Sequence, residues 1–177
     1  MTNSLKSAPW HTHIYIASDH GGVELKQYLL DVVQKKYCGE SGVKNPSLRR
    51  ANDNPKDNDA GYVTDLGVMT KESVDYPNVA AKMAGAIQNH PGSCGIILCG
   101  SGVGVSIAMN RFSFIRAVLV SDPVTAALSR RHNDANVMCL GARLVGEVMA
   151  QSCVHAFLSE AFEGGRHDAR VAMLSTL

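Results

Sequence analysis

A cysteine follows an apolar run and opens a glycine-rich turn in the segment CGSGVG, residues 99–104. The turn precedes an expected helix, whose N-terminus favours a thiolate at Cys99 and can stabilise an oxyanion or a phosphate through backbone N–H groups. A cysteine at the end of a buried strand is also a small apolar side chain, and glycines also allow tight strand–helix packing. The dinucleotide fingerprint does not fit, because Val105 stands where its third glycine is needed. The residues alone leave a reactive and a structural role open.

Two other segments carry groups suited to a phosphorylated sugar. Asp19 and His20 follow an expected strand in SDHGG, where a carboxylate can accept from a sugar hydroxyl and an imidazole can donate to a phosphate. Arg166 and Arg170 are four residues apart in GGRHDAR and fall on one helix face, where they could bind a phosphate together. A solvated basic face explains the two arginines equally well.

Short apolar runs that alternate with helical patterns must position these groups. The expected strands cover residues 14–17, 62–66, 95–99, 117–120 and 136–140. These runs are continuously apolar, which is typical of strands buried on both faces of a parallel sheet. The alternation predicts one α/β domain over residues 1–177, with a five-stranded parallel sheet in the order 2-1-3-4-5. A polar segment at 39–61 is expected to be a surface loop.

That strand order brings the two unusual loops together. Ligands bind in such sheets at the topological switch point, at the carboxyl ends of the strands on either side of it. The switch point lies between the first and third strands, which end in SDHGG and CGSGVG. The sequence therefore predicts a binding site at this edge of the sheet.

Composition argues against several other classes of protein. The net charge of +1 over 177 residues gives no basic surface for nucleic acid, and no apolar stretch approaches the roughly 20 residues of a membrane span. The five cysteines include no C-x-x-C pair, and Cys94 and Cys99 would lie about 16 Å apart along one strand, beyond disulfide reach. We therefore expect a reduced, cytoplasmic protein. The C-terminal Ser-Thr-Leu only weakly resembles the peroxisomal signal Ser-Lys-Leu.

Six segments in this order resemble the ribose-5-phosphate isomerase type B family, which includes allose-6-phosphate and galactose-6-phosphate isomerases. They are SDHGG (18–22), SVDYP (73–77), CGSGVG (99–104), IAMNR–IRA (107–117), SRRHNDANV–LGAR (129–143) and GGRH–R (164–170). The match leaves out residues 1–12 and 39–61. It implies a Rossmann-like three-layer αβα sandwich that forms a homodimer or a dimer of dimers. We expect no metal or other cofactor, because enediolate chemistry at a thiolate needs none.

The resemblance also assigns roles to individual residues. It implies Cys99 as the catalytic base and His132 as the proton-transferring residue that opens the sugar ring. The implied substrate-binding residues are Asp19, His20, Tyr76, Gly100, Ser101, Gly102, Val103, Gly104, Asn133, Arg143, Arg166 and Arg170. Of these, His20 and the three arginines would hold the phosphate. Two positions depart mildly from the family pattern: Ser101 stands where threonine is also common, and Ala169 where a basic residue often stands.

The expected reaction is the interconversion of ribose 5-phosphate and ribulose 5-phosphate through an enediolate, a step of the pentose phosphate pathway. An isomerase of a hexose 6-phosphate, differing in pocket depth, is an alternative. A non-catalytic sugar-phosphate sensor is a second alternative, which Cys99 and His132 together argue against.

Chain direction predicts that each site is shared between two subunits. Helices of this architecture run antiparallel to the strands, so a helix at 123–133 delivers His132 and Asn133 to the edge opposite Cys99. A five-residue strand separates the two edges by about 16 Å. Arg166 follows the helix expected at 147–162 and lies at the same edge as His132. If these residues share one site with Cys99, they must come from a neighbouring subunit.

Overall fold

Five parallel strands form one sheet, as the apolar runs predicted. The computed structural model describes residues 13–38, 62–174 and 176. The strands are β1 (His13–Ser18), β2 (Tyr62–Asp65), β3 (Cys94–Cys99), β4 (Ala117–Leu119) and β5 (Val137–Gly141). All four strand pairs are parallel, and β3 and β5 are buried along their whole length. The polar segment predicted at 39–61 and two residues of the C-terminal Ser-Thr-Leu lie outside the described residues.

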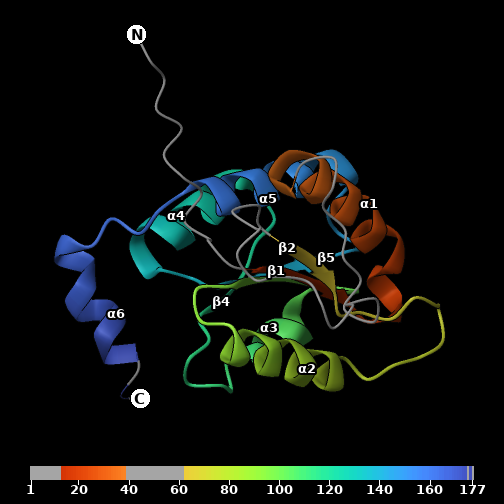
Figure 1. Cartoon of the computed structure of the whole chain (residues 1–177), viewed down its shortest axis with the longest axis horizontal. Helices are drawn as coiled ribbons and strands as arrows, with labels where there is room; N and C mark the ends of the chain where they lie inside the picture. The colour runs from red at the N-terminus through yellow and green to blue at the C-terminus, as the bar shows by residue number, and fades with distance from the viewer. Residues whose placement is uncertain (1–12, 39–61, 175, 177) are drawn as a thin grey trace, which may run out of the picture.

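Helices cover both faces of the sheet and make the predicted three-layer αβα sandwich (Figure 1). One face carries α1 (Val23–Val33), α4 (Pro123–Asn133) and α5 (Glu147–Ser159), and the other carries α2 (Tyr76–Asn89) and α3 (Val103–Met109). Two separate apolar cores result, with Leu29 and Phe157 on the first face and Met83 and Met109 on the second, all fully buried. No helix within the described ranges is long and apolar enough to cross a membrane.

The predicted strand order is wrong for the last two strands. The observed order is β2-β1-β3-β5-β4, so β5 pairs with β3 and β4 lies at the edge. Burial explains the exchange, because β4 has three residues, none fully buried, whereas all five residues of β5 are buried. The Asn110 side chain also pairs with the Ala117 N–H and C=O of β4, both at 2.9 Å. The switch point between β1 and β3 is unaffected.

The corrected order also explains which face each helix covers. The chain moves outward from β3 to β4 and then turns back to β5. Right-handed crossovers in opposite directions place their helices on opposite faces of the sheet. Accordingly α3 packs with α2, whereas α4 packs with α5. In the predicted order both helices would have shared one face.

A buried ion pair fixes β2 and its following turn against α1. Lys26, 1% exposed, donates from Nζ to Oδ2 of Asp65, and the Gly67 amide donates to Oδ1 of the same carboxylate at 2.8 Å. Removing one partner of a buried pair leaves an uncompensated charge in a low-dielectric site, which costs more than the pair itself contributes. This pair lies close to the loops that form the candidate site, because Gly67 packs against the backbone amide of Ser18 at the end of β1.

We therefore expect Asp65→Asn to lower the free energy of unfolding by about 3–5 kcal/mol, because the Lys26 ammonium loses its counter-charge. The amide keeps an acceptor for Gly67, so the substitution tests the charge and its hydrogen bond to Lys26 without removing the contact with the turn. Urea denaturation at fixed protein concentration measures the effect. Glu24→Ala, which breaks the exposed pair of Glu24 with Lys71, is the matched control and should change nothing measurable. If Lys26→Met combined with Asp65→Asn is no more stable than Asp65→Asn alone, the isolated charge is not the cause.

Candidate active site

Three strand ends meet at the carboxyl edge of the sheet and bring predicted residues from distant segments together. The Asp19 amide donates to the Leu98 carbonyl at 3.1 Å, which ties the SDHGG loop to the end of β3. The amides of Ala142 and Arg143 donate to the carbonyls of Cys99 and Gly100, at 2.9 and 3.0 Å. The loops after β1, β3 and β5 therefore form one connected backbone surface at the predicted switch point.

Cys99 is buried, and its sulfur accepts a hydrogen bond from the turn that follows it. The Gly102 N–H lies 3.1 Å from Cys99 Sγ, and hydrogen bonds to a charged acceptor are stronger than those to a neutral one. Three more cysteines have side chains that the structure describes. Burial raises the pKa of the Cys94 and Cys139 thiols far above the ordinary range and that of Cys153 to about 11. Those three thiols are therefore poor nucleophiles and bases.

The Gly100–Gly104 turn requires glycine at two of its positions. Gly102 has a φ of 77°, and a side chain there would also meet Leu119 Cδ1 at 2.5 Å and the Leu140 carbonyl carbon at 2.8 Å. A side chain at Gly104 would meet the Tyr76 ring at 2.8 Å. Tyr76 begins α2, so this contact places the predicted sugar-site tyrosine directly against the turn. The Val103 amide donates to Ser101 Oγ at 3.3 Å within the same turn.

Asp19 and His20 are held by backbone amides of their surroundings. Asp19 Oδ1 accepts from the Gly21 amide at 2.8 Å and caps the short 3-10 turn His20–Gly22. His20 Nδ1 lies 3.2 Å from the Val74 amide and accepts its hydrogen bond. In a neutral imidazole this leaves the proton on Nε2, which can donate to an anion. The nearby SVDYP segment thus orients His20 from across the site.

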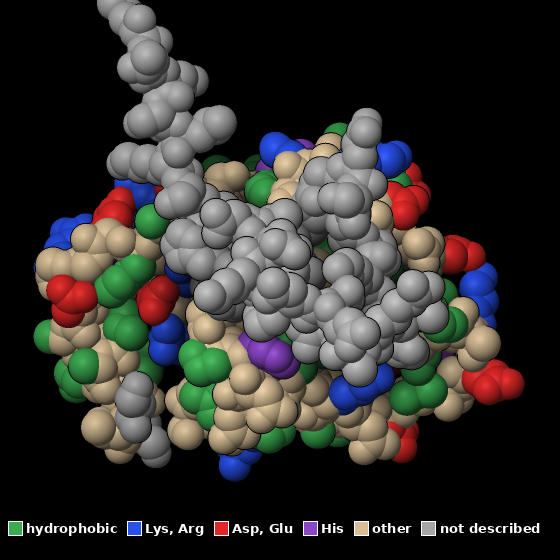
Figure 2. Space-filling model, viewed as in Figure 1, with side chains coloured by type: hydrophobic (Ala, Val, Ile, Leu, Met, Phe, Trp, Pro, Cys, Tyr) green, Lys and Arg blue, Asp and Glu red, His purple; other side chains and the backbone are tan. Residues whose placement is uncertain are grey.

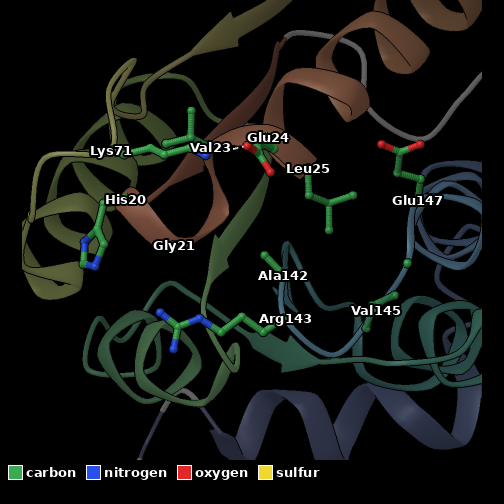
Figure 3. Close-up of a pocket in the computed structure, with 11 residues that line it drawn as sticks. His20, Gly21, Val23, Glu24, Leu25, Lys71, Ala142, Arg143, Val145 and Glu147 are labelled. Carbon is green, nitrogen blue, oxygen red and sulfur yellow. Dashed lines mark hydrogen bonds and ion pairs between the residues drawn. The ribbon is translucent and has the colours of Figure 1, made fainter.

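Arg143 lies over Gly100 and faces the same opening as His20. A side chain at Gly100 would meet Arg143 Cζ and Nε at 3.3 Å, so the glycine leaves room for the guanidinium. Figure 3 shows the His20 ring and the Arg143 guanidinium projecting into one space beside Gly21. Both line a cavity of about 470 Å³, whose wall also includes Lys71, Ala142 and Glu147. Its volume suits a small metabolite, and the cationic groups suit an anionic one.

The remaining predicted residues lie at the opposite, amino edge of the sheet. The turn after α4 is tied to this edge, since the Gly95 amide at the start of β3 donates to the Asn136 carbonyl at 2.9 Å. His132 and Asn133 end α4 just before that turn. Cys99 lies at the other end of β3, about 16 Å away along a six-residue strand. Within one chain, therefore, Cys99 and His132 do not meet.

Arg166 and Arg170 join His132 at the amino edge. Arg166 Nε donates to His167 Nε2 at 3.3 Å, and the His167 ring stacks on the His132 ring with centroids 4.4 Å apart. Burial lowers the pKa of His167, and the charges of His132, Arg166 and Arg170 lower it further. The two arginines lie on different elements, Arg166 in a 3-10 turn (Gly165–His167) and Arg170 in α6 (Asp168–Leu174), rather than on one predicted helix.

Sequence reasoning missed two residues of this second group. Glu163 Oε2 lies 3.7 Å from His132 Nε2 and 4.0 Å from His167 Nε2. The predicted helix at 147–162 ends instead at Ser159, and extended backbone at Glu160 leads the chain back to α4. The sequence did contain a signal for this group. Glu163 and His167 are four residues apart, and a further charged residue, Arg170, follows them.

Known proteins resemble this chain over most of its length. The family model described as Ribose/Galactose Isomerase matches residues 14–174. Ribose-5-phosphate isomerase B of Escherichia coli is 45% identical over 115 residues, 65% of this chain and 77% of that protein. A ribose 5-phosphate isomerase structure from Thermotoga maritima is 37% identical and has a TM-score of 0.78, covering 94% of this chain and 99% of the other.

A further solved structure contains a ligand. Ribose-5-phosphate isomerase B of Mycoplasma genitalium, with bound ribulose-5-phosphate, is 34% identical with a TM-score of 0.77, covering 93% of this chain and 95% of the other. The family match spans nearly all of the described sequence, and the structural matches extend over the same length. The chain belongs to the ribose/galactose isomerase family.

Proposed function

We propose that this protein interconverts ribose 5-phosphate and ribulose 5-phosphate, with Cys99 as the general base. The observation that carries the proposal is the Cys99 sulfur at the switch point, held by the Gly102 N–H. The next residue, Gly100, lies against Gly21 and Arg143, which line the cavity together with His20. The isomerase function of its relatives and the ribulose-5-phosphate bound to one of them support the same reaction. The reaction belongs to the pentose phosphate pathway, and the free thiols of the described cysteines fit the reducing cytoplasm.

In the proposed mechanism a proton moves between C2 and C1 of the open-chain sugar. The Cys99 thiolate removes the C2 proton, the electrons of the C2–H bond form the C1=C2 double bond, and the C1 carbonyl electrons move onto O1. The resulting enediolate is stabilised by backbone N–H groups of the Gly100–Gly104 turn. Transfer of the O2 proton to O1 then moves the negative charge to O2. The O2 electrons form the C2 carbonyl as the C1=C2 electrons take the proton from the Cys99 thiol at C1, which gives the ketose and regenerates the thiolate. General-base catalysis of this kind contributes roughly 10²–10⁴-fold.

Substrate binding divides between the two edges of the sheet. Asp19, Tyr76 and the glycine turn would contact the sugar, while His20 and Arg143 would contact its phosphate. Fixing the phosphate far from the reacting carbons orients C2 toward the sulfur, so that binding energy contributes to the reaction rate. His132, Asn133, Arg166 and Arg170 complete the proposed site from a second chain.

A homodimer with shared sites is the assembly that this division requires. Exposed apolar side chains are present on helices of both faces of the sheet. Val103 and Ile107 on α3, and Val124 and Val148 on α4 and α5, are between 47% and 78% exposed. Clusters of exposed apolar side chains are typical of interfaces between chains. The α6 helix stands beside the sandwich in Figure 1, and hydrophobic side chains are visible on that side of the molecule in Figure 2. Met173 and Leu174 of α6 are exposed. Each proposed site then takes Cys99 from one protomer and His132 from its partner.

Cys99→Ala should lower kcat for ribose 5-phosphate at least about 10²-fold, because the variant lacks the group that removes the C2 proton. Coupled spectrophotometry measures ribulose 5-phosphate formation, and circular dichroism checks the fold. Cys153→Ala, which removes a buried thiol on α5, is the matched control and should keep kcat near wild type. A folded Cys99→Ala variant with normal kcat would exclude the assignment. Galactose 6-phosphate, assayed alongside, tests the hexose alternative.

Mixing two inactive variants tests whether sites are shared. Cys99→Ala and His132→Ala should each be nearly inactive, yet regain roughly a quarter of wild-type activity when co-refolded. Random pairing makes about half of the dimers mixed, and each mixed dimer has one intact site out of two. Native mass spectrometry of differently tagged chains confirms the mixing. Mixed dimers without recovered activity would contradict the shared site, whereas activity in either variant alone would contradict the assigned role of its residue.

A further inference from the structure

Glu163 is fixed against the last turn of α4, next to His132. Its backbone N–H donates to the Arg131 carbonyl at 3.0 Å, so the main chain is held independently of the carboxylate. Oε1 accepts from Arg131 Nε at 2.6 Å, and Oε2 faces His132 Nε2 at 3.7 Å. The hydrogen bond from Arg131 lowers the pKa of Glu163. A negative charge therefore stands beside the imidazole at neutral pH.

His167 does not compete strongly for that charge. It is 7% exposed, and its Nε2 accepts from Arg166 Nε at 3.3 Å, which requires an unprotonated nitrogen. Burial lowers the pKa of His167 in the same sense. His132 is the more exposed of the two rings, with a third of its side chain accessible. The charge of Glu163 therefore acts mainly on His132, and the neutral His167 ring stacks against the His132 ring.

The three side chains also lie close enough together to be considered as metal ligands, with ligand atoms within 4.8 Å of one another. Two features argue against a metal. The His132 and His167 rings are stacked with only 7° between their planes, so their in-plane lone pairs do not converge on one point. Arg131 and Arg166 also bring positive charge to Glu163 and His167. The cluster is suited to proton transfer rather than to binding a cation.

We propose that Glu163 is a positioning residue for His132, facing Nε2 of the imidazole and stabilising its protonated form during ring opening. This rests on the proposed function. Neutral His132, with Nε2–H directed to Glu163, takes the O1 hydroxyl proton at Nδ1. The O1–H electrons form the C1 carbonyl as the bond between C1 and the ring oxygen breaks. The imidazolium then gives its Nδ1 proton to the released ring oxygen and becomes neutral again.

The charged groups around His132 come from three parts of the chain. Arg131 belongs to α4, Glu163 to the segment after α5, and Arg166, His167 and Arg170 to the last two helical segments. All but Glu163 are cationic or neutral, so Glu163 provides the negative charge in this group. Removing it takes away the negative charge that faces the imidazolium formed during ring opening.

The test compares Glu163→Gln with Arg131→Gln across pH 5.5–9, roughly the range over which histidine titrates. Both substitutions break the Arg131–Glu163 ion pair, but only the first removes the charge beside His132. We expect Glu163→Gln to lower kcat for ribose 5-phosphate about 10-fold, with KM within about twofold of wild type. The limb of the kcat profile set by His132 should move about 0.5–1 pH unit lower. Arg131→Gln should keep kcat within about threefold and leave that limb unmoved or higher.

Two controls separate the outcomes. Glu163→Asp keeps the charge and should recover part of the lost activity. This variant also tests the proposal if Glu163→Gln does not fold. NMR titration of the His132 ring should show the same downward movement in Glu163→Gln, independently of turnover. The proposal is overturned if Glu163→Gln leaves both the profile and the titration unchanged, or if Arg131→Gln reproduces the loss. A wild-type protein that does not convert ribose 5-phosphate would instead refute the proposed function, while the titration still reports on Glu163.

Discussion

All five strands run in one direction, and this fixes the edge of the sheet that every loop reaches. The loops after β1, β3 and β5 reach the carboxyl edge, and the loop after α4 reaches the amino edge. A six-residue strand makes these edges about 16 Å apart, which is longer than a pentose ring. No rotamer of His132 can span that distance. The division of the proposed machinery between two edges, and hence between two chains, follows from strand direction and length.

At the carboxyl edge the chemistry depends on close backbone approach. A side chain at Gly141 would meet the Ser101 carbonyl oxygen at 2.6 Å, so the end of β5 and the turn after β3 share one small space. The turn packed there has the conformation in which the Gly102 N–H faces the Cys99 sulfur. The side chains of Asp19 and His20 are held by hydrogen bonds from the main-chain amides of Gly21 and Val74. The polar groups are therefore oriented before any substrate arrives, so little reorganisation accompanies the reaction.

The sequence was sufficient for the carboxyl-edge half of the site, because strand ends and glycine turns are local signals. Cys99, Asp19 and His20 converge there as predicted, since only the positions of β1 and β3 matter for that result. The order of β4 and β5 was not predictable in the same way. It depends on which of two apolar runs is buried more completely, and β4 turned out to be a three-residue edge strand. Glu163 was missed because its place beside His132 depends on α5 ending at Ser159, three residues before the predicted end.

The central claim is that one folded chain holds half of a site and that catalysis requires two. Dilution tests this directly, by measuring kcat per chain and the fraction of dimer, by mass photometry, over the same range of protein concentrations. Our account predicts that activity falls in proportion to the dimer fraction, and that saturating ribose 5-phosphate delays both losses together, because bound substrate contacts both chains. Full activity per chain in a preparation that is entirely monomeric would contradict the account.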